Sequence, residues 1–143
     1  WKTTKFWSRV MSDGDRPVWV KSGIYRAVLV DWKRSHPHFG RVDLLMWFRI
    51  VDEGDFYSVV IPAYYRVTWA KGNNFSAGWH SYFCRDYQQC FGPVERKDRF
   101  AMSKFESVQL KVKVVENTTD SKGEPLARVN QYSRVERVLE VVS

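Results

Sequence analysis

The spacing of hydrophobic residues changes twice along this chain, and this change constrains the fold more than any other feature. Between residues 23 and 69, apolar side chains recur mainly at every second position, which is typical of β-strands. Between residues 75 and 90 they recur at every fourth position, which is typical of an amphipathic helix. From residue 107 onward the two-residue alternation returns. The pattern therefore predicts strands, then one helix, then strands again.

The alternation and the turn residues set the expected bounds of these elements. The strands are expected at residues 23–34, 41–51 and 56–69 before the helix, and at 107–116 and 127–142 after it. The acidic turn Asp52-Glu53-Gly54-Asp55 should join the second and third strands as a hairpin. The helix should start near Asn74, an available N-cap, and end before Gly92. Residues 135–140 could also form a short helix, so the end of the last strand stays open.

The length of 143 residues fits a single domain. We expect a domain over residues 23–143, preceded by an N-terminal arm of residues 1–22 that packs Phe6 and Trp7 onto it. Cys84 and Cys90 lie too far apart along one helix for a relaxed disulfide. Two free thiols, no signal peptide and no long apolar stretch favour a cytoplasmic protein without a membrane span.

Three strands, a helix and two further strands follow each other in the order of an OB-fold. In that fold the helix between strands three and four plugs a closed five-stranded barrel. The fold class that we predict is therefore mainly β, an OB-like barrel with one α-helix between its third and fourth strands.

Two segments also carry a likeness to a known group of proteins. Residues Gly23–Leu29, and Leu44–Asp52 before a glycine turn, resemble the opening of small OB-type single-stranded-DNA-binding and replication-accessory proteins of phages and plasmids. The likeness covers residues 23–60 and implies a role in DNA replication on a mobile element. Cellular bacterial single-stranded-DNA-binding proteins recruit partners through a flexible tail with an acidic tip, whereas this sequence stops at Val141-Val142-Ser143, so we expect that the protein does not recruit partners in that way.

Charge and aromatic content favour the same function. The formal net charge is +7, and aromatic residues make up 16% of the chain. Basic surfaces attract polyanions by releasing counterions, and exposed rings stack on unpaired bases. The alternative is that the rings fill a core and the charge only keeps the protein soluble.

OB-folds bind ligands across strands two and three, between the loops that follow strands one and four. The candidate nucleic-acid-binding residues on strands two and three are therefore Trp47, Arg49, Tyr65, Arg66 and Trp69. The flanking cations are Lys33, Arg34, Arg41, Lys111, Lys113 and Lys122. Tyr64 and Tyr65 are adjacent, so at most one of them should face the ligand. Trp47 could instead be a core residue, and Arg49 or Arg66 could pair with Asp31 or Asp43.

We expect no enzyme, cofactor or metal site. The chain has no glycine-rich phosphate loop and no nucleophile motif, and the pair His36 and His38 lacks further ligands at metal-binding spacing. The leading prediction is a sequence-tolerant protein that binds single-stranded DNA or RNA, and we expect the ligand to be DNA. The alternatives are a phage-encoded inhibitor or adaptor of a host protein, such as an anti-CRISPR, and a homo-oligomeric structural subunit.

Overall fold

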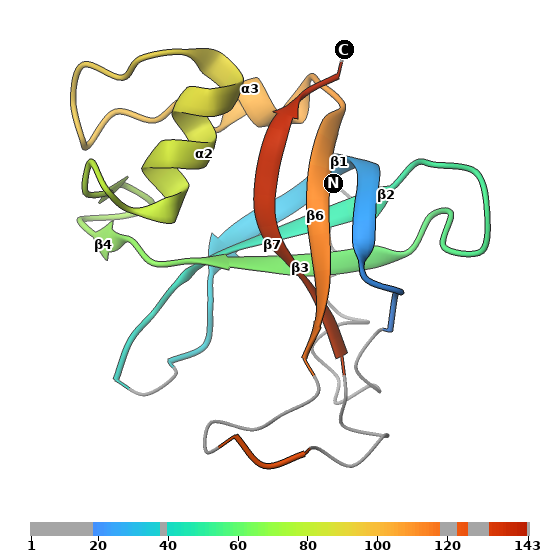
Figure 1. Ribbon diagram of the computed structural model, residues 1–143. Helices are drawn as coiled ribbons and strands as arrows, with labels where there is room; N and C mark the ends of the chain where they lie inside the picture. Colours follow the sequence, from blue (N-terminus) through green and yellow to red (C-terminus); the bar gives the residue numbers. More distant parts are fainter. Residues whose placement is uncertain (1–18, 38–39, 118–122, 126–131, 143) are drawn as a thin grey trace.

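Figure 1 shows the computed structural model of the chain, which describes residues 19–37, 40–117, 123–125 and 132–142. Five strands close into a barrel in the order β1-β2-β3-β7-β6. Their bounds are Gly23–Arg34 (β1), Leu44–Ile50 (β2), Val60–Tyr65 (β3), Leu110–Asn117 (β6) and Tyr132–Val141 (β7). Neighbouring strands are antiparallel except β3 and β7, which pair in parallel at Ala63 and Val135. The prediction of a mainly-β, five-stranded, OB-like barrel is confirmed.

β1 is long because it pairs with two neighbours in succession. Its residues 23–27 pair with β6 and its residues 27–34 pair with β2, so both of its edges are hydrogen-bonded. The register with β2 shifts between Leu29 and Asp31, which leaves Val30 as a bulge. A bulge bends a strand and increases its twist, and this curvature allows the sheet to close.

The helix α2 is shorter than its hydrophobic spacing predicts. It spans Tyr82–Phe91, and its N-cap is Ser81, whose Oγ accepts a hydrogen bond of 3.2 Å from the backbone N of Cys84. It ends at Gly92, whose φ of 90° is unfavourable for other residues and whose N–H donates to Gln88 O at 2.9 Å. The predicted start near Asn74 is wrong.

The residues before α2 form a small hairpin rather than a helical turn. β4 (Thr68–Trp69) pairs with β5 (Phe75–Ser76) in a separate two-stranded sheet. Phe75 therefore reaches the core from a strand, whereas Trp79 is 43% exposed. Their spacing from Phe83 resembles a helical stripe although neither residue is helical.

Two further expectations are corrected by the loops. The predicted strand 56–69 is split, because residues 51–59 form the β2–β3 loop and Arg66 and Val67 separate β3 from β4. A second helix, α3 (Ser103–Glu106), follows the charged connector and buries Phe105, so the expected single helix is also wrong. The open question at residues 135–140 is answered, since they lie within β7.

Aromatic rings join the helices to the barrel core. Phe83 of α2 packs edge-on against Phe75 and Phe100, with ring centroids 5.4 and 5.0 Å away, and Phe91 packs against Phe105 at 4.9 Å. These rings belong to, or pack against, the buried cluster that includes the inward side chains of β1, β2, β3, β6 and β7. Figure 1 shows α2 and α3 together at one end of the molecule, beside β7. The end that they cover is the one where the candidate site lies.

The expected N-terminal arm lies almost wholly outside the described residues. Only residues 19–22 of it are described. There Val20 is fully buried, and its backbone N–H donates to Ser133 Oγ at 2.7 Å. Among the described helices, none combines the length and apolar character that crossing a bilayer requires.

Candidate functional site

The outer face of β2 does not present the exposed tryptophan that the sequence predicts. Trp47 stands opposite Asp31 on β1 and Pro62 on β3, and it is only 7% exposed. It forms a small apolar cluster with Leu45 and Val60. Its indole N–H is buried without a hydrogen-bond acceptor in the described structure. The ring is therefore not available for stacking in this conformation, as the core alternative anticipated.

Arg49 and Lys33 also lie on this outer face. Arg49 is half-buried opposite Val28 and Val60, and it has no ion-pair partner among the described residues. Lys33 stands opposite Leu45, one step nearer the end of the barrel. Their role in binding stays a prediction.

Tyr64 and Tyr65 point to opposite sides of β3, as their adjacency requires. Tyr65 is 3% exposed and packs in the barrel core against Phe83 at 5.4 Å. Tyr64 is 48% exposed. Tyr65 is therefore a buried residue rather than an exposed stacking surface, although it borders the cavity described below, and Tyr64 occupies the accessible position.

Tyr65 instead belongs to a buried polar network centred on Asp86 of α2. Asp86 Oδ2 accepts hydrogen bonds from Tyr65 Oη at 2.7 Å and from Val138 N at 3.0 Å. Its Oδ1 accepts from Arg137 Nε at 2.8 Å and also from Arg137 Nη2. Because four donors surround the carboxylate, its burial is compensated and α2 is held against β3 and β7.

The network changes the ionisation of its members. Burial raises the pKa of Tyr65 well above its usual value, and the nearby Asp86 charge and hydrogen bond raise it further. The hydrogen bond to Asp86 likewise raises the pKa of Arg137, so this guanidinium remains charged.

Trp69 and Arg34 have structural contacts that the sequence did not indicate. Trp69 lies on β4 rather than on the third strand of the barrel, and its Nε1 donates to Val42 O at 3.0 Å. The guanidinium of Arg34 lies 4.4 Å from the Trp69 ring centroid. Arg34 also donates to Ala70 O at 3.0 Å and Gly72 O at 2.6 Å. Through these contacts Arg34 and Trp69 hold the β4–β5 hairpin against the end of β1.

A large cavity lies where β3 ends, between the β4–β5 hairpin, the start of α2 and β7. Its volume is about 740 Å³, within the usual range of ligand pockets. We call it the tyrosine cleft, and its principal aromatic and basic residues are Tyr64, Arg66, His80, Tyr82, Arg134 and Arg137. Three arginines and one glutamate line it, which leaves a net charge of +2.

The side chains of the tyrosine cleft differ in how firmly they are held. Tyr82 is 62% exposed, and the guanidinium of Arg137 lies 4.7 Å from its ring centroid. Arg134 Nε donates to Asn117 Oδ1 at 2.9 Å. Arg66 is exposed and has no hydrogen-bond or ion-pair partner among the described residues. The cleft thus combines two accessible rings with one cation, Arg66, that has no described partner.

A smaller pocket of about 360 Å³ lies on the other side of Tyr64. Its lining includes His36 and Arg41 from the loop after β1, and Tyr132 from the start of β7. Arg41 Nε bonds Asp43 Oδ1 at 2.9 Å, so Asp43 pairs with Arg41 and not with Arg49 or Arg66. Tyr64 is the wall that the two cavities share.

The lysines of the fourth barrel strand, β6, do not line the tyrosine cleft, although Lys113 pairs with Glu136, which does. Lys111 pairs with Glu140 at 3.1 Å and Lys113 pairs with Glu136 at 3.2 Å, both across the β6–β7 register. Neither lysine lines the cleft. Lys122 lies outside the described residues.

The sequence reasoning missed Tyr82, Arg134 and Arg137 as site residues. Arg134 could have been found, because alternation over residues 132–136 places it on the outer face of the last strand. Arg137 could not have been found in this way, because the register between β6 and β7 shifts just before it and the alternation of faces is interrupted there. Tyr82 carries no sequence signal that separates it from the other residues of its helix.

The described part of the chain brings no three His, Cys, Asp or Glu side chains together in a geometry that would hold a metal ion. Comparison with known proteins finds no matching family model, no matching curated protein and no matching solved structure. Function is therefore inferred from the site itself.

Proposed function

We propose that this protein binds single-stranded nucleic acid, largely without sequence preference, through the tyrosine cleft. One observation carries the proposal: the cleft brings the exposed rings of Tyr64 and Tyr82 together with Arg66, Arg134 and Arg137 at one end of an OB-like barrel. Rings beside cations are what an unpaired strand requires, because its bases stack and its phosphates carry negative charge.

The magnitudes are sufficient for useful affinity. Each base stacked on an aromatic side chain contributes about 1–3 kcal/mol, and every base has a face that can stack. Each cation that neutralises a phosphate releases counterions, which makes binding sensitive to salt. The net charge of +7 on the whole chain adds attraction at longer range. The sequence resemblance implies a role in the DNA replication of a phage or plasmid, and this role remains an expectation.

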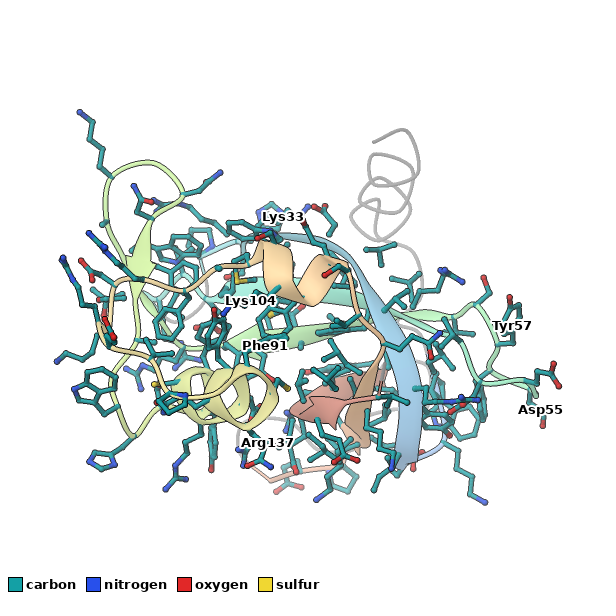
Figure 2. All side chains as sticks on the ribbon, turned by 90° about the horizontal axis from the view of Figure 1, so that it is seen from above. Lys33, Asp55, Tyr57, Phe91, Lys104 and Arg137 are labelled. Carbon is teal, nitrogen blue, oxygen red and sulfur yellow. The ribbon has the colours of Figure 1, made fainter. Side chains whose placement is uncertain are left out.

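The direct test is fluorescence anisotropy of a labelled oligo-dT titrated with the protein at low and moderate salt. Tyr64→Ala should weaken binding by about 5- to 150-fold, since it removes about 1–3 kcal/mol of stacking. Tyr57→Ala is the matched control, because Tyr57 is 56% exposed on the β2–β3 loop. Figure 2 shows Tyr57 at the end of the molecule opposite α2.

A second pair of variants tests the charge. Arg66→Ala should weaken binding and lower the slope of log K against log salt by about 0.7, the value for one phosphate contact on a single strand. Arg99→Ala removes a charge that is also exposed, on the α2–α3 connector outside the tyrosine cleft, and should lower affinity less.

Absence of binding at low salt would contradict the proposal. In that case a pull-down from nuclease-treated lysate examines the alternative prediction of a protein inhibitor or adaptor. A partner retained without nucleic acid would favour that alternative.

A further inference from the structure

A second cavity follows the seam between α2 and β7 and reaches β6. Its volume is about 520 Å³. We call it the seam pocket, and its exposed or polar lining includes Ile24, Arg85, Gln89, Lys111, Arg137 and Glu140. Arg137 lines both the seam pocket and the tyrosine cleft, so the two cavities adjoin at this side chain. Figure 2 shows Arg137 directly beside α2.

Arg137 is held in place and still has donors to offer. Its Nε and Nη2 both bond Asp86 Oδ1, and its guanidinium packs on the ring of Tyr82. A guanidinium has five N–H donors, and no described residue accepts from Nη1 of Arg137. The contacts with Asp86 and Tyr82 therefore orient the side chain without using all of its hydrogen-bonding capacity.

Two further cations lie along the seam pocket. Arg85 is exposed on α2 one turn before Gln89, and no described residue pairs with its side chain. Lys111 pairs with Glu140 at 3.1 Å, but both side chains are about half exposed. Exposed ion pairs contribute little to stability, so an approaching phosphate competes for Lys111 at small cost.

The seam pocket differs from the tyrosine cleft in one chemical respect. None of the described residues that line it is aromatic, whereas three tyrosines line the cleft. It offers guanidinium, ammonium and amide donors but no ring on which a base could stack. The carboxylates of Asp86 and Glu140 also line it, but each is paired with a cation of the pocket, so the lining keeps a net charge of +1 and Arg85 is the cation without a paired carboxylate. The seam pocket therefore fits a chain of phosphates and not the bases.

We propose that the seam pocket binds the sugar–phosphate backbone of a strand that leaves the tyrosine cleft past Arg137. This inference rests on the proposed function and adds a second contact region of a different chemistry to it. The cleft holds bases and phosphates, and the seam pocket holds phosphates alone.

The test uses a short oligo-dT that binds the cleft, extended at its 5′ or its 3′ end. Each extension is made either of thymidines or of abasic units, which keep the phosphate and lack the base. We expect one of the two ends to raise affinity, and the abasic extension to raise it as much as the thymidine extension. The end that does so also reports the direction of the strand.

The variant Arg85→Ala should remove most of this gain while leaving the affinity of the short oligonucleotide unchanged. The salt slope for the extended oligonucleotide should fall by about 0.7, as expected for one lost phosphate contact. Arg99→Ala is the matched control, since Arg99 is also exposed and lies outside the seam pocket. An unchanged urea midpoint shows that both variants are folded.

Two results would overturn this inference and leave the proposed function standing. The first is a gain only with base-bearing extensions, and the second is no gain from either end while the short oligonucleotide still binds and still depends on Tyr64. Failure of every oligonucleotide to bind would overturn the proposed function and this inference together.

Discussion

The phenol of Tyr65 donates a hydrogen bond of 2.7 Å to the carboxylate of Asp86, and this bond ties β3 to α2 inside the protein. Tyr65 Oη also accepts from the backbone N of Val138 at 3.2 Å, so the same side chain reaches β7. The Asp86 carboxylate and its donors position α2, which forms one wall of the tyrosine cleft. A change that weakens this network should therefore also change the shape of the cleft.

Replacing Tyr65 with Phe should reduce the free energy of unfolding by about 1–3 kcal/mol, because it removes a buried donor from a charged acceptor. The measurement is urea denaturation followed by circular dichroism. Tyr64→Phe is the control on the neighbouring residue, whose hydroxyl bonds no described residue, and it should change stability by less than about 0.5 kcal/mol. Equal effects of the two substitutions would contradict the structural role of the Tyr65 hydroxyl.

Alkaline pH should destabilise the protein through Tyr65. The pKa of Tyr65 in the folded state lies well above the ordinary 10.0, because burial and Asp86 disfavour the phenolate. As pH rises past 10, the unfolded state therefore loses this proton before the folded state does. The stabilisation is complete below pH 10 and is lost progressively above it.

The slope of unfolding free energy against pH should accordingly be negative above pH 10, and shallower in Tyr65→Phe. Tyr25 and Tyr64 also have raised pKa values, so part of the slope should remain in that variant. A variant whose slope equals that of the unmodified protein would show that Tyr65 does not titrate as its environment implies.

The thiol of Cys90 should react slowly at neutral pH. Burial, together with the negative charges of Asp86 and Glu140, raises its pKa from 9.0 to about 11. Because the thiolate is the nucleophile, the rate of alkylation by iodoacetamide should keep rising to about pH 11. Mass spectrometry of the Cys90 peptide, with a short cysteine peptide as reference, measures the profile, and a plateau near pH 9 would disagree with it.

The N-cap of α2 gives a test of where this helix begins. Ser81→Ala removes the acceptor for Cys84 N and should cost about 1 kcal/mol of unfolding free energy. Ser81→Gly should cost only a few tenths, because glycine is itself tolerated at an N-cap. The measurement is urea denaturation of both variants. If Ser81 were not a cap, both substitutions would change the free energy of unfolding only slightly.

How far the sequence predicts the fold can be judged from individual elements. The alternation of apolar residues was sufficient for β1 and β6, because a two-residue period directly reports a strand with one buried face. It was insufficient at Phe75, because two side chains four residues apart can also reach one core from a strand and a helix. Hydrophobic spacing reports burial, and it does not report which backbone conformation achieves it.

The candidate site was less predictable than the fold. The sequence required Tyr64 and Tyr65 to face opposite ways, but only the register with β2 and the contact with Phe83 decided that Tyr65 is the buried one. Arg34 carries the same charge as Arg66, yet Arg34 is engaged by Trp69 and two carbonyls whereas Arg66 is free of described partners. Residue type identified both as candidates, and only the three-dimensional contacts separated them.

The sequence by itself thus determined the order of the five barrel strands with a helix between the third and the fourth, the mainly-β class and the basic, aromatic character of the chain. The tertiary structure alone decided that Asp86 meets Tyr65 and Arg137, which lie 21 and 51 residues away from it in the chain. Local periodicity is a property of neighbouring residues and can be read along the chain. A cleft is made where distant segments meet, and their meeting depends on strand register, bulges and the packing of a helix against the barrel.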